Sequence, residues 1–272
     1  AGAGLGDLVP AKAVATADAA LDLCKRAHLL PAALHVPVAG AAVPANIQRL
    51  TERDMAACGP EDAGLGDSAL EIVSCAAVPL NGLDARFVVF RSPSSARDQV
   101  AVIIGDPDPD QAVPVRMHSA CLTGDLFGSL RCDCGDQLRQ TMDALETGGV
   151  LLYLDQEGRG IGLRNKLRAY ALQDTGLDTI DADLNLGYGP DERRYEIAAS
   201  MLRQLGLLRV RLLTNNPEKM AALAGAGIEV AGHTSLLGPM TKENRRYLAA
   251  KAERGGHMLE ALFANRTGSA RA

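Results

Sequence analysis

The chain has 272 residues, of which 47% are hydrophobic and 22% charged, and its formal net charge is -5. This composition is ordinary for a globular protein and excludes a fibrous or disordered chain. The acidic balance also argues against an electrostatic nucleic-acid binder, which shows a basic domain or stripe. A local basic pocket can still bind a phosphorylated small molecule.

Membrane and secretion signals are missing from the sequence. It has no run of about eighteen apolar residues and no signal-peptide pattern. The six cysteines belong to a chain that is too long and too rich in core residues for a disulfide-stapled scaffold, which favours a reducing compartment. We therefore expect a cytoplasmic protein without membrane contacts.

The first third of the chain, residues 1–96, is rich in Ala and Pro. Its patterns predict an amphipathic helix at 17–27, a loop at 31–44, a helix at 46–58, a linker at 59–67 and strands at 70–78 and 85–91. It contains no cluster of His, Asp, Glu or Lys to which chemistry can be assigned.

After residue 97, short apolar runs alternate with helical patterns. The predicted strands are 100–105, 113–119, 150–154, 209–214 and 228–230. The predicted helices are 136–149, 161–173, 191–206 and 217–227. Such alternation predicts an α/β domain in which helices cover a sheet.

Three cysteines mark the strongest motif, HSACLTGDLFGSLRCDCGDQL. Ten residues separate Cys121 from Cys132, and one separates Cys132 from Cys134. Three thiolates at this spacing can converge on one zinc ion and leave a fourth position for water, as in catalytic zinc sites. In an extended segment, a C-x-C pair also places both side chains on one face.

Two alternatives remain open for these cysteines. His118 precedes Cys121 by three residues and could complete four ligands, which would make the site structural. The thiols could instead be buried and bind no metal. Gly128 and Gly135 flank the last two cysteines and allow the tight turn that convergence requires.

The second motif, DQEGRGIGLRNKLRAYALQD, follows a predicted strand. Its glycines at 158, 160 and 162 open a helix, which suits backbone N–H groups aimed at an anion. The spacing is neither the dinucleotide fingerprint nor a P-loop. Four basic residues follow within ten positions, and a solvated helix face accounts for about half of them: Arg159, Arg164, Lys166 and Arg168.

Together with RMHSACLTGD, DERRYEIAASML and RLLTNNPEKM, these motifs resemble GTP cyclohydrolase II in order and spacing over about residues 98–259. The resemblance implies a three-layer mixed sheet covered by helices, a catalytic domain at 97–260 and a tail at 261–272. Residues 1–96 lack the acidic signature of dihydroxybutanone phosphate synthase. We interpret them as a smaller α+β accessory or oligomerisation domain.

The resemblance also implies the reaction. The family opens the imidazole ring of GTP, releases C8 as formate, loses pyrophosphate and delivers a diaminopyrimidinone ribosylamine phosphate to riboflavin synthesis. By resemblance, Cys121, Cys132 and Cys134 hold zinc that activates water, Mg²⁺ accompanies the triphosphate, and the chain forms a homodimer.

Further residues are implied to bind GTP: Arg116, Met117, His118, Ser119, Ala120, Gln137, Glu157, Gly158, Arg159, Thr179, Thr214 and Lys219. Among them, Glu157 suits guanine N1 and N2, whereas Arg159 and Lys219 suit phosphates. Without the resemblance, Thr179 and Thr214 would be interpreted as strand-end or capping residues.

Three positions match the family's catalytic residues. Asp191 is implied as proton acceptor, Tyr170 as proton donor or orienting hydroxyl, and Arg193 as nucleophile towards the α-phosphate. Because a guanidinium stays protonated, we favour charge stabilisation for Arg193. Asp191 could also cap a helix.

One position departs from the family pattern, since Asp155 stands where many members carry arginine. Two rival hypotheses also remain. The first is a paralogue that stops after ring opening or acts on another nucleotide. The second is a zinc protein that senses a nucleotide without turning it over.

Overall fold

A computed structural model describes residues 16–34, 47, 49–51, 53–54, 70–92, 97–259 and 263. Most of the helix predicted at 46–58, the linker at 59–67 and nearly all of the tail at 261–272 lie outside these residues. Within the described ranges, no helix combines the length and apolar character needed to cross a membrane.

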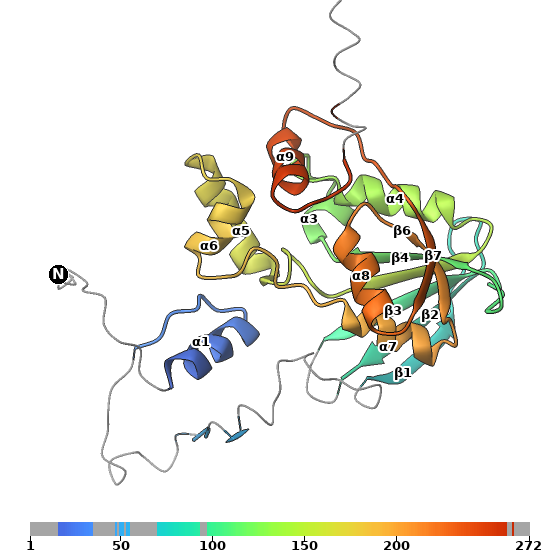
Figure 1. The fold of residues 1–272 in the computed structure, drawn as a ribbon, viewed down its shortest axis with the longest axis horizontal. Coiled ribbons are helices and arrows are strands. Elements are labelled where there is room, and N and C mark those ends of the chain that lie inside the picture. The colour runs from blue at the N-terminus through green and yellow to red at the C-terminus, as the bar shows by residue number, and fades with distance from the viewer. Residues whose placement is uncertain are drawn as a thin grey trace, which may run out of the picture.

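A seven-stranded sheet forms the centre of the fold in the order β1-β2-β3-β5-β4-β6-β7 (Figure 1). Its strands are β1 (Glu71–Ala77), β2 (Ala85–Arg91), β3 (Asp98–Ile104), β4 (Val113–Ser119), β5 (Gly149–Leu154), β6 (Arg209–Leu213) and β7 (Glu229–Thr234). The pairs from β1 to β5 are antiparallel, whereas β5, β4, β6 and β7 run parallel. Each strand predicted from the sequence forms, and the mixed α/β class is confirmed.

Helices cover both faces of this sheet. On one face, α4 (Cys134–Ala144) packs Leu138 against a cluster that includes Leu151. On the other, α7 (Glu196–Gln204) and α8 (Pro217–Gly225) pack Met201 and Leu223 with Leu152. Because successive strand residues point to opposite faces, neighbouring leucines of β5 serve both cores. The result is the expected three-layer arrangement.

The sheet corrects the separation expected near residue 97. Strand β2 lies before that position and β3 after it, yet the two are antiparallel neighbours, with Val88 opposite Ala101. Val88 is 3% exposed and Ala101 is fully buried, in one core with residues of β4 and β5. Strand β2 therefore belongs to the main sheet, because its buried face has its partners there. Strand β1, whose residues are all exposed, joins the same sheet at its edge by pairing with β2.

Most predicted helices form. The α5 helix spans Gly162–Asp174, close to its expected range. The α7 helix begins later than expected, because Glu192 uses its side chain to accept from the loop amide of Gly189 at 2.7 Å. Three helices were not predicted, α3 (Leu122–Asp125), α6 (Thr179–Asn185) and α9 (Arg245–Glu253). Of these, α6 is capped by Asp178, the residue before its start, whose carboxylate accepts from the amide of Asp181.

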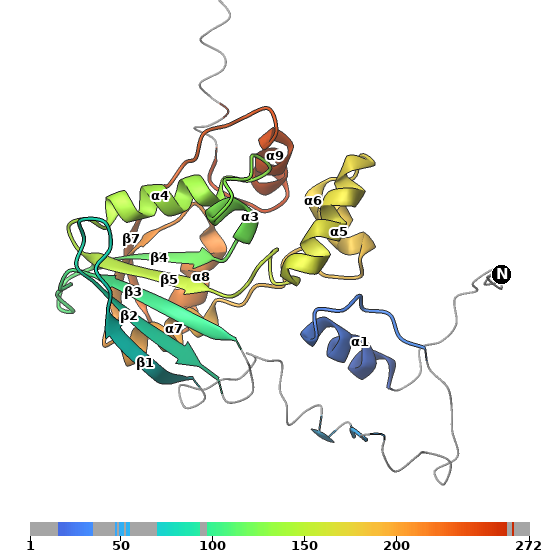
Figure 2. The same ribbon diagram turned by 180° about the vertical axis from the view of Figure 1, so that it is seen from behind.

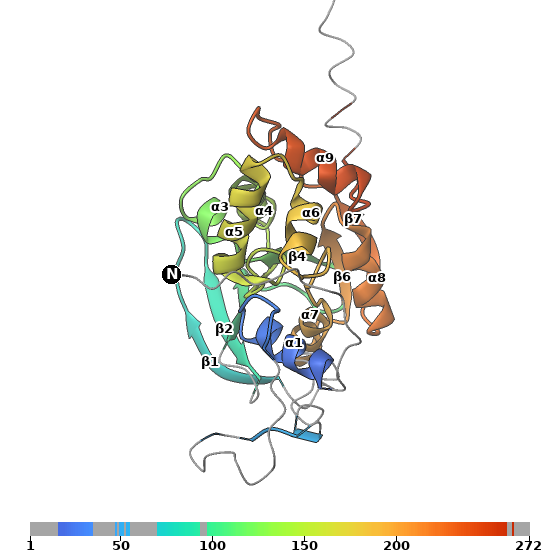
Figure 3. The ribbon, with the colours of Figure 1, turned by 90° about the vertical axis from the view of Figure 1, so that its left-hand side faces the viewer.

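The carboxyl ends of β4 and β5 lie side by side, with Ser119 opposite Leu154. Helices α5 and α6 lie beyond this edge, as the reverse view shows (Figure 2). The predicted amphipathic helix is confirmed as α1 (Ala17–Arg26), with Asp18 in its first turn and Lys25 in its last, an order that suits the helix dipole. It lies beside α5 and α6 (Figures 1 and 3). In sheets of this kind, ligands bind outside the carboxyl ends of parallel strands.

Candidate active site

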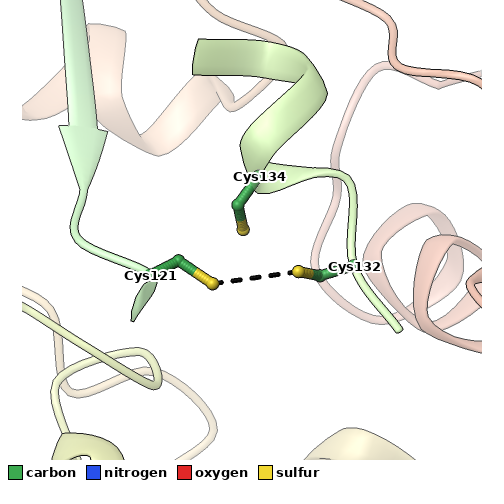
Figure 4. A group of neighbouring side chains, drawn as sticks. All are labelled: Cys121, Cys132 and Cys134. Carbon is green, nitrogen blue, oxygen red and sulfur yellow. Dashed lines mark hydrogen bonds between the residues drawn. The ribbon is translucent and has the colours of Figure 1, made fainter. Parts of the chain in front are cut away.

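The three motif cysteines converge beyond the carboxyl end of β4 (Figure 4). Cys121 follows β4, Cys132 lies in the turn before α4, and Cys134 begins that helix. Their Sγ atoms all lie within 4.8 Å of one another, and those of Cys121 and Cys132 are 3.8 Å apart. Tetrahedral zinc with Zn–S bonds of about 2.3 Å requires an S–S separation of roughly 3.8 Å. The spacing therefore fits zinc.

Two glycines allow this convergence. A Cβ on Gly124 would lie 2.9 Å from Sγ of Cys132 and 3.0 Å from Sγ of Cys121. A Cβ on Gly135 would lie 2.2 Å from the carbonyl oxygen of Gly124. The extended C-x-C geometry expected from the sequence was wrong, because the helix begins at Cys134. A turn and a helix start, rather than a strand, bring the thiols together.

The electrostatics of the cluster favour a cation. Hydrogen bonding to Cys121 raises the pKa of Cys132 to about 11. Hydrogen bonds to the other two thiols, together with burial, raise the pKa of Cys134. Three thiolates so close together repel one another unless a positive charge compensates them. A divalent cation that prefers sulfur ligands would provide that compensation.

His118 is engaged elsewhere. Its Nε2 lies 3.0 Å from both carboxylate oxygens of Asp125, and its ring stacks on Tyr153 with centroids 5.6 Å apart. The same carboxylate accepts from the backbone N–H of Cys121 at 3.0 Å. His118 therefore supports the loop of Cys121 through Asp125, and the cluster remains a three-ligand set.

The thiols open into a cavity beyond the carboxyl ends of β4 and β5. Eleven of the predicted site residues line it: Ser119, Ala120, Cys121, Cys132, Cys134, Glu157, Gly158, Arg159, Tyr170, Thr179 and Arg193. They come from β4, α4, the β5–α5 loop, α5, α6 and the loop before α7. The fold thus brings two distant motifs to one hollow.

Glu157 and Lys166 form a buried ion pair on the cavity wall. Nζ of Lys166 donates to Oε1 of Glu157 at 2.7 Å, and each side chain is 10% exposed. The other carboxylate oxygen of Glu157 accepts from the backbone N–H of Leu122 at 2.6 Å. Lys166 also lies 3.1 Å from Sγ of Cys121. One lysine thus links the carboxylate to the thiol cluster.

Arg159 has a left-handed backbone, with φ of 60°, a conformation that ordinary side chains adopt rarely. Its carbonyl accepts from the amide of Glu192 at 3.0 Å. Its guanidinium lies 3.8 Å from the carboxylate of Asp183, which also lines the cavity. Burial raises the pKa of Asp183 to about 7, against the opposing charge of Arg159.

Asp191 and Arg193 face each other in the loop before α7. Nε of Arg193 donates to Oδ1 of Asp191 at 2.8 Å, and Nη2 bonds the other carboxylate oxygen. Although burial opposes ionisation, these hydrogen bonds lower the pKa of Asp191. Asp191 does not cap α7, which begins five residues later. The pair is a bidentate salt bridge, which fixes the plane of the guanidinium group.

A second basic group lies deeper. Arg116 is 5% exposed and donates to Gln137 Oε1 at 2.7 Å, while Lys219 is 5% exposed and donates to the carbonyl of Met117 at 2.7 Å. Burial lowers the pKa of Lys219, with further lowering from Arg116 and Arg193. The interior beside the cavity therefore carries an excess of positive charge.

The family model for GTP cyclohydrolase II matches residues 71–235. The chain belongs to the GTP cyclohydrolase II family. It is 51% identical over 253 residues to a GTP cyclohydrolase-2 of Xylella fastidiosa (strain Temecula1), covering 89% of this chain and 61% of that protein. It is 46% identical over 252 residues to one of Azospirillum brasilense, covering 88% and 64%.

A riboflavin biosynthesis protein RibBA of Bacillus cytotoxicus is 52% identical over 165 residues, or 60% of this chain and 42% of that protein. The chain thus spans about three fifths of the length of the GTP cyclohydrolase-2 relatives it matches. The match to the GTP cyclohydrolase II family model begins at Glu71, the first residue of β1. Its match therefore includes both strands that precede residue 97.

Some residues expected from the GTP cyclohydrolase II pattern lie off the cavity wall: Arg116, Met117, His118, Gln137, Asp191, Thr214 and Lys219. Met117 is 1% exposed and packs in the core. Thr214 follows β6, and its hydroxyl accepts from the amide of Asn216 at 3.0 Å. Thr179 is the first residue of α6 and lines the cavity.

Seven residues that line this cavity were not predicted from the sequence, and three of them are titratable: Lys166, Asp183 and Tyr247. Lys166 was one of four basic residues within ten positions, and helical spacing could have separated it from the exposed Arg164 and Arg168. Asp183 and Tyr247 lie on α6 and α9. Since neither helix was predicted, nothing in the sequence indicated their direction.

Proposed function

We propose that this chain hydrolyses GTP with zinc, giving a diaminopyrimidinone ribosylamine phosphate, formate and pyrophosphate, the first step of riboflavin synthesis. One observation carries the proposal. The three-thiol cluster opens into the same cavity as Glu157, Arg159 and Arg193. A metal site, a carboxylate suited to a purine edge and cations suited to phosphates thus share one hollow.

Cys121, Cys132 and Cys134 would hold the zinc ion. Zinc bound by three protein ligands acts as a Lewis acid and supplies a strong nucleophile from water near neutral pH, here for C8 of the purine. Lys166, 3.1 Å from Sγ of Cys121, reduces the negative charge that the thiolates place on the metal site. A less negative metal site is a stronger Lewis acid, so this ammonium group would favour formation of the oxygen nucleophile from bound water.

Glu157 would recognise guanine. Its carboxylate is held by Lys166, Leu122 N and Gly158 N. Each carboxylate oxygen offers two lone pairs. Oε1 already accepts from Lys166 and from Gly158 N, and Oε2 from Leu122 N, so one lone pair, on Oε2, remains for a donor of the base, N1 or N2. A site built to receive this donor rejects a purine that lacks it, because its buried acceptor would stay unpaired.

The cationic side chains would bind the triphosphate. Arg159 and Arg193 line the cavity, and the positive charge around Arg116 and Lys219 lies behind it. A polyanion would relieve their mutual repulsion. Mg²⁺ on the triphosphate would neutralise charge as pyrophosphate leaves.

Arg193 and Tyr170 would act on the reacting groups. Asp191 holds Arg193 protonated and raises its pKa against the effect of burial, which supports charge stabilisation at the α-phosphate rather than nucleophilic attack. Burial raises the pKa of Tyr170 to about 12. Its hydroxyl therefore stays protonated at neutral pH and can donate a hydrogen bond or a proton to the opening ring.

The test is to incubate zinc-loaded protein with GTP and Mg²⁺ and to measure formate, pyrophosphate and the pyrimidinone product. Equal release of formate and pyrophosphate is expected. Cys132→Ser should lose bound zinc and formate release. The exposed Cys75 gives the matched control, and Cys75→Ser should keep both.

Other outcomes separate the alternatives. Pyrophosphate without formate would indicate a paralogue with a partial reaction, and bound GTP without either product would indicate a sensor. Tyr170→Phe should slow turnover while nucleotide binding persists. A homodimer in the cytoplasm stays a prediction, which light scattering and cell fractionation can check.

A further inference from the structure

The segment 25–31, outside the part of the chain that the family model matches, packs against the loop that carries Asp191 and Arg193. Nζ of Lys25 lies 2.9 Å from Oε1 of Glu192, and both side chains are about one-third exposed, at 34% and 31%. Glu192 stands between the two proposed catalytic residues. Lys25 of α1 thus forms an ion pair with the residue that directly follows Asp191 and directly precedes Arg193.

Glu192 ties this loop together. Oε1 accepts both from Lys25 and from the backbone N–H of Gly189 at 2.7 Å. Its own N–H donates to the carbonyl of Arg159 at 3.0 Å. Gly160 allows the contact between the two loops, because a Cβ there would lie 2.8 Å from the carbonyl carbon of Glu192. The position of Glu192 therefore bears on Arg159 as well as on Arg193.

Backbone contacts dock the same segment next to these loops. Asn165, fully buried, donates to the carbonyl of His28 at 2.9 Å. The hydroxyl of Tyr188, which is 4% exposed, donates to the carbonyl of Leu29. A Cβ on Gly187 would lie 3.0 Å from the ring of Pro31. Two buried donors of the catalytic region, on Asn165 and Tyr188, thus bond to carbonyls of residues 28 and 29.

His28 itself is held in an uncommon backbone conformation, with φ of 51°. A Cβ on Gly162 would lie 2.3 Å from Nδ1 of His28, so only glycine leaves room for this ring. The other ring nitrogen, Nε2, lies 2.7 Å from a guanidinium nitrogen of Arg97. The charges of Arg97 and Asp155 both act on its ring. Asp155, the departure from the family pattern, therefore lies near this docked segment.

We propose that residues 25–31 are a built-in positioning element of the active site, and that Lys25 is a positioning residue that acts through Glu192 on Asp191 and Arg193. The proposal rests on the proposed function in one respect, since its kinetic consequence requires GTP turnover. Its structural consequence, an ordered loop at 189–193, can be measured without turnover.

The kinetic experiment compares Lys25→Ala, Lys25→Arg, Glu192→Gln and the double variant Lys25→Ala/Glu192→Gln in the full chain. We expect kcat of Lys25→Ala to fall about three- to tenfold, since a part-exposed ion pair contributes modestly. KM for GTP should change less than about twofold, because Lys25 does not line the cavity. Lys25→Arg should restore kcat, and the double variant should be no worse than the single ones.

The matched control is Asp22→Asn, which breaks the pair of Asp22 with Arg26 inside α1, an N–O distance of 2.7 Å, without touching the loop. Unchanged kcat in Lys25→Ala, or an equal loss in the control, would overturn the proposal. Additive losses in the double variant would show that Lys25 does not act through Glu192, and would also overturn it.

Hydrogen exchange gives the second readout. In Lys25→Ala, amides of the peptide covering 188–195 should exchange faster than in the unmodified chain, with no change in the control. If the unmodified chain does not turn over GTP, the proposed function fails while this measurement still decides the positioning role. Identical exchange in both proteins would contradict the role whatever the kinetics.

Discussion

The Nζ atom of Lys166 lies 3.1 Å from Sγ of Cys121. It also donates to Oε1 of Glu157 at 2.7 Å and to the hydroxyl of Thr123 at 2.9 Å. The three donor positions of the ammonium group therefore all have partners. A single buried cation couples the proposed metal site to the proposed guanine-binding carboxylate.

Removal of this cation should destabilise the fold. Lys166→Met leaves the buried carboxylate of Glu157 without its countercharge, and we expect a loss of about 3 kcal/mol in the free energy of unfolding. The double variant Lys166→Met/Glu157→Gln should regain part of that loss, because no unpaired charge remains. Urea unfolding at pH 7 measures both. A double variant less stable than Lys166→Met would contradict the ion-pair account.

Gly124→Ala should disrupt the thiol cluster. The new Cβ would lie within 3.0 Å of two sulfur atoms and would force them apart. We expect zinc content well below one ion per chain, measured by elemental analysis, and a weaker thiolate-to-cobalt absorption band after cobalt substitution. The control is Gly225→Ala in α8, where nothing lies within 4 Å of the added Cβ. That variant should bind metal as the unmodified chain does.

Asp183 should make stability depend on pH. Burial raises its pKa to about 7. The charge of Arg159 lowers this pKa, whereas the negative charges of Asp191, Asp178 and Glu192 raise it further. The folded protein holds this proton more tightly than the unfolded chain does. The contribution of Asp183 to the free energy of unfolding is therefore complete below about pH 4 and is lost as the pH rises through about 7.

The matching variant is Asp183→Asn. Since one pKa unit corresponds to about 1.4 kcal/mol, we expect the unmodified chain to lose on the order of 2 kcal/mol more than Asp183→Asn between pH 5 and pH 8. Urea midpoints at several pH values provide the comparison. Parallel pH profiles for the two proteins would show that Asp183 does not titrate in this range.

Arg193→Lys should keep the charge but lose the fork that bonds both oxygens of Asp191. We expect kcat to fall by about two orders of magnitude, as when one aligned donor to a developing charge is removed. GTP binding, measured by calorimetry, should weaken much less. A variant with normal kcat would exclude the proposed action on the α-phosphate.

Local patterns in the sequence were enough for the elements of the sheet and for the metal motif. All seven strands lie where apolar runs predicted them. For β2 to β6, burial on one or two faces leaves a direct trace in residue order, whereas β1 and β7 are edge strands without a fully buried residue. The convergence of Cys121, Cys132 and Cys134 was predicted from their spacing, because the ten residues between the first two, with flanking glycines, can close a short loop. The cavity-lining positions of Glu157, Arg159 and Tyr170 followed from the resemblance.

Only the tertiary structure decided which side chains the core and the cavity exclude from water. The pairing of β2 with β3 across residue 97 depends on long-range hydrogen bonds, and the start of α7 depends on loop amides captured by Asp191 and Glu192. Lys166 and Arg164 have the same charge two positions apart, yet one is buried and the other exposed. The helix turns by about 100° per residue, so the neighbours that pack against each face, and not the residue types, fix which cation enters the site.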